Sequence, residues 1–339
     1  MKCCIGGSAL DRIRGRLRQL SAVIFPLLIG LISGVAAANP QDFSGWLDGL
    51  RDEARANGIS EATISIALGD IVPVPRVIEL DRNQPESTLR FEEYLARLVT
   101  EERIRDGRAL MAENASLLQQ VAQRYGVEPR FIVALWGVES DYGRRTGAFN
   151  VLAALATLAY DGRRAAYFRK ELLQALRIVD EGHISPAAMT GSWAGAMGQN
   201  QFMPSSFLDF AVDFDGDGRR NIWSSRADVF ASIANYLSRA GWQTHQGWGR
   251  QVRIAATFDQ SLIGLEQRRT LAEWSRLGLV QADGSPLPTS ELNASLAQPA
   301  GRGGAVYLAY DNYRVILRWN RSLYFATAVG TLADRLGGS

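Results

Sequence analysis

The sequence predicts a mainly helical α+β protein. Apolar residues recur at three- and four-residue spacing through most of the chain between 43 and 240, which is the periodicity of amphipathic helices. Glycines and capping residues interrupt the pattern at intervals typical of helix ends. After Gly241 the pattern weakens, and short segments typical of strands occur up to residue 310. We therefore expect a helical core with a small β-containing subdomain late in the chain.

Residues 1–38 have the three-part pattern of a secretory signal peptide. A basic segment precedes an apolar stretch at 22–35, and Ala36-Ala37-Ala38 provides small residues for cleavage. The apolar stretch is short for a membrane span, so we expect a mature chain that begins at Asn39, with an uncleaved anchor as the alternative. The basic segment contains Arg12, Arg14, Arg16 and Arg18.

Composition and charge exclude several classes of protein. The only two cysteines, Cys3 and Cys4, precede the apolar stretch, so we expect neither a disulfide nor a lipid anchor in the mature chain. The two histidines, His183 and His245, cannot form a His-rich zinc site and have no cysteine nucleophile to assist. The formal net charge of +2 argues against nucleic acid as a partner. We expect a soluble protein of the bacterial periplasm.

The N-terminal region, residues 39–126, is expected to be helical. Two short helices between Phe43 and Leu68 are separated by Asn57-Gly58, and Ser60 has the position of an N-cap. Two Val-Pro pairs end this part at Pro75. A longer helical stretch follows from about Thr88 to Tyr125, and Gly126 closes it.

Glu139 breaks the pattern of the helix that carries it, which we expect to run from Pro129 to Gly143. Its spacing places the carboxyl on the same face as three apolar side chains, Ile132, Leu135 and Trp136. Burial and the negative end of the helix dipole both disfavour the ionised form. A carboxyl group held in its protonated form near neutral pH can donate a proton to a glycosidic oxygen. The alternative is a glutamate at the rim, paired with Arg144 or Arg145.

The rest of the expected core, residues 127–250, is also helical. Helices are expected at 151–160, 165–181, 205–210 and 226–240. Beyond it we expect a small α/β subdomain at 251–310, which contains a weakly alternating segment at 251–258, a Pro- and Ser-rich segment at 285–300 and a strand at 305–310. The last segment, 311–339, includes a helix at 322–336 and is expected to complete the helical core.

The segment G-S-W-A-G-A-M-G-Q-N-Q-F-M-P-S-S, residues 191–206, is rich in glycine and amides. Glycines at this density make a poor surface helix, and they allow the backbone to approach something closely. One interpretation is a groove for a sugar chain, with polar donors from Ser192, Gln199, Asn200 and Gln201. The other is tight helix-to-helix packing through the small residues.

The loop from Asp213 to Asn221 has the spacing of an EF-hand calcium loop, with oxygen ligands at positions 1, 3, 5 and 9 and glycine at position 6. Position 12 is Ser224 in place of the bidentate glutamate, so Asp228 is expected to close a longer loop, 213–228. We expect a structural Ca²⁺ site and no organic cofactor; a solvated acidic turn is the alternative. The candidate metal-site residues are Asp213, Asp215, Asp217, Arg219 and Asp228.

Four motifs in this order give the chain a resemblance to the lytic murein transglycosylase B family: E-S-D-Y-G, the glycine-rich segment above, the aspartate loop ending in N-I-W, and Y-D-N-Y-R-V-I-L-R-W-N-R-S. The resemblance runs from about residue 41 to the end, and V-I-E-L-D-R-N-Q-P-E at 77–86 is similar to the family's N-terminal half. It implies a lysozyme-like helical catalytic core. It also implies cleavage of the MurNAc-β-1,4-GlcNAc bond of peptidoglycan without water, leaving a 1,6-anhydro-MurNAc end.

By motif position, the resemblance implies that Glu139 is the single catalytic acid and base. Asp141, two residues further on, points roughly 200° away on a helix and is poorly placed as a second carboxylate. The substrate-binding residues that the resemblance implies are Ser192, Gln201, Tyr167, Tyr236, Trp319 and Asn320. Two positions depart from the family, which commonly has tyrosine where this chain has Trp319 and Phe325.

The expected partners are the glycan strands of peptidoglycan, with cell-wall synthesis complexes as candidate protein partners. Many relatives carry a separate peptidoglycan-binding domain, and we expect none here. Two alternatives stay open: a lysozyme-type hydrolase, in which water attacks, and a non-catalytic wall-binding protein. An unused buried carboxyl group would cost stability, which argues against the binding protein. The sequence does not indicate an oligomeric state.

Overall fold

The computed structural model describes residues 40–83 and 89–338. The expected signal peptide, Asn39, the expected helix start at Thr88 and the end of the motif at 77–86 lie outside the described residues. Within the described ranges, no helix combines the length and the hydropathy that crossing a bilayer requires.

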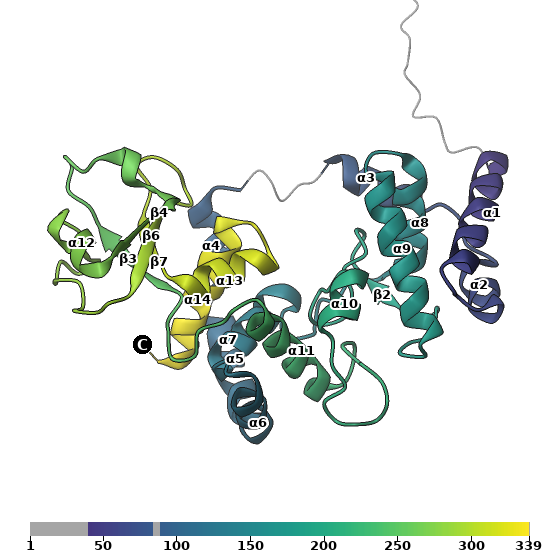
Figure 1. Cartoon of the computed structure of the whole chain (residues 1–339), viewed down its shortest axis with the longest axis horizontal. Coiled ribbons are helices and arrows are strands. Elements are labelled where there is room, and N and C mark those ends of the chain that lie inside the picture. The colour runs from purple at the N-terminus through teal and green to yellow at the C-terminus, as the bar shows by residue number, and fades with distance from the viewer. Residues whose placement is uncertain (1–39, 84–88, 339) are drawn as a thin grey trace, which may run out of the picture. The chain divides into compact units, whose positions relative to one another are not determined.

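One hydrophobic cluster joins the N-terminal helices to a central pair. Helices α8 (Val151–Asp161) and α9 (Ala165–Asp180) lie side by side, with α1 (Pro40–Ala56) and α2 (Glu61–Leu68) next to them (Figure 1). Ser60 caps α2 as predicted, since its side chain accepts a hydrogen bond from the Thr63 backbone N–H. Helix α3 (Pro75–Asn83), which the sequence analysis did not predict, packs on α8.

The stretch predicted as one helix up to Tyr125 is three helices. They are α4 (Phe91–Leu98), α5 (Glu101–Glu113) and α6 (Ala115–Tyr125). Thr100 starts α5, because its hydroxyl accepts a hydrogen bond from the Arg103 N–H. Asn114 ends α5 and starts α6. Gly126 closes α6 in the left-handed conformation, as predicted.

Helix α7 (Pro129–Ser140) lies at the centre of a second cluster. Every residue from Phe131 to Gly137 is buried, and four helices pack on α7: α5, α6, α11 (Arg226–Arg239) and α14 (Leu323–Gly337). Helix α13 (Asp311–Trp319), which was not predicted as a helix, packs on α14 and α11. The short helix α10 (Pro204–Phe210) bridges α9 and α11.

The β portion comes late in the chain, as predicted, and the predicted strand at 305–310 is present as β7, while the other strands were not predicted as such. A five-stranded sheet has the order β4-β6-β7-β3-β5, and every neighbouring pair is antiparallel. Strand β6 falls in the segment predicted as Pro- and Ser-rich, and its residues are buried in two clusters: Ala294 and Leu296 in one, and Ala297 in the cluster around α7. The bounds are β3 (Gly249–Arg253), β4 (Gly264–Thr270), β5 (Val280–Gln281), β6 (Asn293–Ala297) and β7 (Val306–Ala309), with α12 (Leu271–Arg276) after β4.

Two further strands, β1 (Phe149–Asn150) and β2 (Thr190–Gly191), have two residues each and pair antiparallel with each other. Strand β1 directly precedes α8, and β2 leads into the glycine-rich segment. The predicted core 127–250 contributes to two hydrophobic clusters, one around α7 and one around α8 and α9. The domain boundaries stay a prediction.

The end of α7 is fixed by a buried tyrosine. The helix ends at Ser140, three residues before the predicted Gly143, because Asp141 and Tyr142 adopt left-handed φ values of 52° and 59°. The Tyr142 hydroxyl donates to the Arg103 carbonyl at 2.8 Å. A Cβ at Gly137 would lie 2.6 Å from the Tyr142 ring, and one at Gly107 would lie 2.3 Å from its hydroxyl. Two glycines therefore leave the space that this ring fills.

We predict that Gly137→Ala lowers the free energy of unfolding by about 1–3 kcal/mol, because the added methyl group overpacks the Tyr142 ring. Urea denaturation measures this loss. Gly49→Ala is the matched control: it lies in α1 with no atom near its added Cβ and is expected to stabilise by about 0.5–1 kcal/mol. Equal effects of the two substitutions would contradict the role of Gly137.

Candidate active site

Glu139 lies in the last turn of α7, and its carboxyl group meets a residue from α13. The indole Nε1 of Trp319 donates a hydrogen bond of 2.6 Å to Glu139 Oε1. An indole N–H can only donate, so this carboxyl oxygen acts as the acceptor and the other oxygen is left for a proton. The two residues are 180 positions apart in the chain.

The environment of Glu139 favours the protonated carboxyl. Its side chain is partly exposed, yet protein atoms surround the carboxyl, and burial raises its pKa from 4.5 to about 8 while the Trp319 hydrogen bond lowers it. Because the pKa of Glu139 is higher in the folded state than its ordinary value, protonation of this group stabilises the folded protein. The stabilisation is fully present below about pH 4.5 and is lost as the pH rises through about 8.

The neighbouring charged groups pair with one another. Asp141 accepts ion pairs from Arg103 at 3.2 Å and Arg144 at 3.1 Å, and Arg145 approaches it at 3.6 Å. Arg144 and Arg145, which were the alternative partners expected for Glu139, thus pair with Asp141 instead. Asp141 itself lies just outside the helix, as its C-cap, so the predicted helical angle to Glu139 does not apply, and Glu139 forms no ion pair with any described residue.

Aromatic rings hold Trp319 in place. Its ring lies 4.7 Å from the Tyr236 ring and 5.1 Å from the Phe202 ring, measured between centroids. The Tyr236 hydroxyl donates to the Arg318 carbonyl at 2.7 Å, which ties α11 to the end of α13. Asn320 follows directly, is exposed, and accepts the Ser322 N–H at 3.1 Å. Of the predicted residues, Trp319 contacts Glu139 directly, Tyr236 contacts Trp319, and Asn320 follows Trp319 in the chain.

The glycine-rich segment is an irregular loop, not a helix, and it packs against the chain that follows Glu139. A Cβ at Gly147 would lie 2.1 Å from the Gly191 carbonyl oxygen. Gln201, in the left-handed region with φ 49°, donates from Nε2 to the Thr146 carbonyl at 3.0 Å. Ser192 Oγ accepts the Ala196 N–H at 3.0 Å. Tight packing of the protein on itself thus explains the glycines, while Ser192 and Gln201 remain partly exposed.

Two amides that were candidates for binding a sugar are structural instead. Gln199 Oε1 accepts from Trp136 Nε1 at 2.8 Å, and its Nε2 donates to the Trp223 carbonyl at 2.8 Å. Asn200 is fully buried and donates to the Val229 carbonyl at 3.1 Å. These contacts fasten the loop to α7 and α11. The sequence did not indicate them, because the partners lie far away in the chain.

Two further positions lie apart from the carboxyl. Tyr167 is 47% exposed on α9, with its ring edge-on to Phe168 at 5.1 Å. Phe325, where a tyrosine was noted as the family's common residue, is buried in the cluster around α7. Its apolar ring suits that position.

The aspartate loop brings three carboxylates together. Ligand oxygens of Asp213, Asp215 and Asp217 lie within 4.8 Å of one another, and all three side chains are exposed. Asp228 lies outside this group: it is buried at the start of α11, and its carboxyl accepts the Phe214 and Asn221 N–H groups at 2.8 and 2.6 Å. It braces the loop from behind. The Arg219 N–H donates to Asp217 Oδ1 at 2.8 Å.

Comparison with known proteins gives consistent matches. A family model described as "Transglycosylase SLT domain" matches residues 42–334. The chain is 34% identical over 244 residues to the membrane-bound lytic murein transglycosylase B of Escherichia coli (strain K12), and this covers 71% of the chain and 66% of that protein, just under two thirds of its length.

Solved structures are also similar. SltB3 from Pseudomonas aeruginosa, in complex with NAG-anhNAM-pentapeptide, matches with a TM-score of 0.85 at 45% identity, covering 88% of this chain and 80% of that chain. The Escherichia coli lytic transglycosylase Slt35 in complex with calcium matches with a TM-score of 0.73 at 30% identity, covering 89% and 94%. These matches confirm the predicted mainly helical, lysozyme-like fold and the predicted resemblance.

We predict that Trp319→Phe raises the pKa of Glu139 by about one unit, because it removes a donor that favours the carboxylate. Carbon-13 NMR titration of labelled glutamate measures this, with Glu139→Gln to assign the resonance. Trp46→Phe, in the other helical cluster, is the control and is expected to leave the pKa unchanged. If the pKa of Glu139 were unchanged in Trp319→Phe, the indole hydrogen bond would not be one of the contacts that set this pKa.

Proposed function

Because the chain belongs to the transglycosylase SLT family, we propose that it is a lytic transglycosylase that cleaves the MurNAc-β-1,4-GlcNAc bond of peptidoglycan without water. The observation that carries the proposal is the Glu139 carboxyl, held protonated near neutral pH and bonded to Trp319. SltB3, a relative at 45% identity, binds NAG-anhNAM-pentapeptide and NAG-NAM-pentapeptide. We extend that class of ligand to this chain.

In the first step Glu139 acts as a general acid. Its proton passes to the oxygen that links MurNAc to the next sugar, and the C1–O bond breaks while positive charge develops at C1. A pKa of about 8 supports this role, since most of the carboxyl is protonated at pH 7. Release of the proton leaves a carboxylate.

In the second step the Glu139 carboxylate acts as a general base. It takes the proton of the MurNAc C6 hydroxyl, whose oxygen attacks C1 and closes the 1,6-anhydro ring. This proton replaces the one that Glu139 gave to the departing sugar, so the reaction needs neither water nor a second carboxylate. The pairing of Asp141 with Arg103 and Arg144 supports a mechanism with one carboxyl group.

The other predicted residues take supporting roles in this proposal. Ser192 and Gln201 hold the sugar near the bond that is cut, and Tyr236 lines the cleft beside Trp319. Exposed Asn320 supports the N-acetyl group or the charge at C1. Exposed Tyr167 contacts the glycan further along the cleft.

We predict that Glu139→Gln lowers kcat at least 1,000-fold on purified peptidoglycan, roughly the loss of general acid–base catalysis. Mass spectrometry of the released fragments should show 1,6-anhydro-MurNAc ends with the unmutated protein only. Glu102→Gln, an exposed carboxyl on α5, is the matched control and should keep full activity.

The fragment ends separate this proposal from its alternatives. Reducing MurNAc ends would mean that water attacks and that the protein is a lysozyme-type hydrolase. No release from the unmutated protein under conditions where it binds peptidoglycan would mean a wall-binding protein.

We further propose that Asp213, Asp215 and Asp217 bind a structural Ca²⁺ ion. Three clustered carboxylates on an exposed loop fit the oxygen ligands that Ca²⁺ prefers. In this proposal the Arg219 position lies within the binding loop, and Asp228 supports the site by holding the loop backbone. Slt35, a relative at 30% identity, was solved in complex with calcium. The ion would neutralise the carboxylates and fasten the loop to α11.

We predict that millimolar Ca²⁺ raises the melting temperature of the unmutated protein by several degrees, at about 2–4 °C per kcal/mol of stabilisation. The double variant Asp213→Asn, Asp215→Asn should lose this rise, measured by scanning calorimetry. Asp283→Asn, on another exposed turn, is the control. A rise that survives the double variant would exclude this loop.

We also propose that the protein acts in the periplasm, where peptidoglycan is found, after export by the N-terminal signal peptide. The segment 1–38 supports this through its sequence pattern alone. Cell-wall synthesis complexes remain candidate partners.

A further inference from the structure

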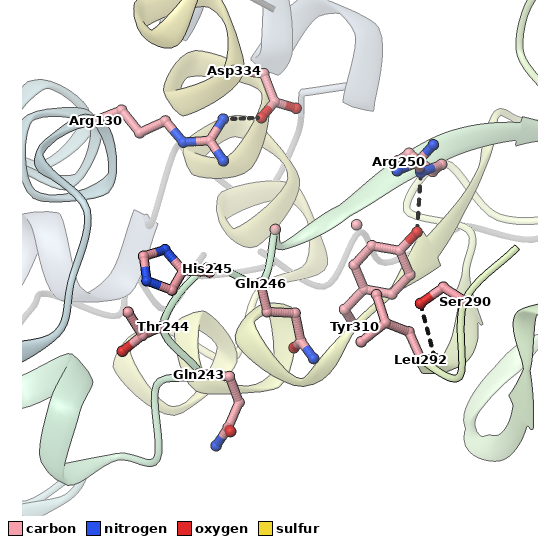
Figure 2. Close-up of a pocket in the computed structure, with 12 residues that line it drawn as sticks. Arg130, Gln243, Thr244, His245, Gln246, Arg250, Ser290, Leu292, Tyr310 and Asp334 are labelled. Carbon is pink, nitrogen blue, oxygen red and sulfur yellow. Dashed lines mark hydrogen bonds and ion pairs between the residues drawn. The ribbon is translucent and has the colours of Figure 1, made fainter. Parts of the chain in front are cut away.

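A polar pocket of about 750 Å³ lies between α7, α14 and the end of the sheet where β3 and β6 begin and β7 ends. Figure 2 shows Arg130 and Arg250 on two sides of it, with Gln246 and Tyr310 between them. The segment between α11 and β3 forms one wall, and the residues before β6 form another. Its volume is in the range of pockets that bind small ligands.

The pocket is separate from the Glu139 site. Arg130 and Glu139 are both on α7, nine residues apart, which is about two and a half helical turns and places them on opposite faces. The rise between them is roughly 13 Å along the helix axis. Neither Glu139 nor Trp319 lines the pocket. A ligand bound here would leave the cleft at Glu139 free.

The charged groups in the pocket favour an anion. Arg250 donates to the Tyr310 hydroxyl and to Gln281 Oε1, each at 3.0 Å, and both acceptors are uncharged. Arg130 pairs with Asp334 at 3.1 Å, and Asp334 also accepts from Trp248 Nε1 at 2.8 Å. Two guanidinium groups thus face one carboxylate, so the lining has a net positive charge, and an arginine fork matches a carboxylate.

The pocket also contains an acceptor without a donor. The side-chain oxygen of Gln246 is buried and receives no hydrogen bond from any described residue. Buried amide oxygens are nearly always satisfied, so a ligand that brings an N–H group would complete this one. A simple inorganic anion offers no N–H.

We propose that this pocket binds an acidic peptide, and specifically the stem peptide of peptidoglycan, at a site distinct from the one that cuts the glycan. A carboxylate of the peptide pairs with Arg250, and a neighbouring peptide N–H donates to the Gln246 oxygen after that side chain turns toward the pocket. This assignment of the peptide rests on the proposed function. Since the pocket and Glu139 occupy opposite faces of α7, the peptide belongs to a strand other than the one being cleaved. The pocket therefore holds the enzyme on the wall.

Calorimetry with the synthetic tripeptide L-alanyl-γ-D-glutamyl-meso-diaminopimelate tests the proposal on the mature protein. We expect binding that weakens at least tenfold in Arg250→Gln and in Gln246→Leu. Arg253→Gln, an exposed arginine on the same strand, and Glu139→Gln should bind as the unmutated protein does. Melting temperatures confirm that each variant is folded, and Arg250→Lys, which keeps the charge, should recover part of the affinity.

The proposal would be overturned if the unmutated protein did not bind the tripeptide. It would also be overturned if Arg250→Gln and Gln246→Leu bound it as tightly as the unmutated protein, or if Glu139→Gln lost binding. Acetate that competes as well as the tripeptide would also overturn it, because the pocket would then be a general anion site. Activity separates this proposal from the proposed function. Arg250→Gln should cut peptide-free glycan strands normally and show a KM raised several-fold on peptide-bearing peptidoglycan. If the unmutated protein forms no anhydro ends, the proposed function fails, and the calorimetry still decides whether the pocket binds the peptide.

Discussion

The site depends on one carboxyl group that is surrounded by protein and has one hydrogen-bond donor. Burial raises the pKa of Glu139, whereas a carboxyl group exposed at the surface is ionised near neutral pH. The indole of Trp319 opposes burial and keeps the pKa of Glu139 near 8. Under the proposed function Glu139 releases a proton and takes one up again, so each form has to be reachable from the other.

Much of the described structure maintains that balance. Tyr142, fitted against Gly137, follows the end of α7 at Ser140 and so fixes where the carboxyl points. Gln199 bonds to Trp136 on the preceding turn and fastens the glycine-rich loop beside it. Tyr236 and Phe202 leave Trp319 little freedom to turn. A small change in any of these contacts would move either the acid or its donor.

Local patterns in the sequence were sufficient for most helices and for Glu139, because periodicity and caps are local signals. They failed where partners are distant. The donor to Glu139 is 180 residues away, so no spacing could indicate it. The amides of Gln199 and Asn200 were expected to face a sugar, and only tertiary contacts reveal that they bind the protein. Strand β6 lacks a clear alternation since both faces are largely buried, and polar flanking residues concealed it.

The hydrogen bond between Glu139 and Trp319 also links activity to the order of synthesis. A ribosome makes α7 long before α13, and a chain that has only its first part contains the acid without its donor. The carboxyl gains its working environment when the C-terminal helices dock. An unfinished or incompletely folded molecule therefore contains the Glu139 carboxyl without the donor that lowers its pKa.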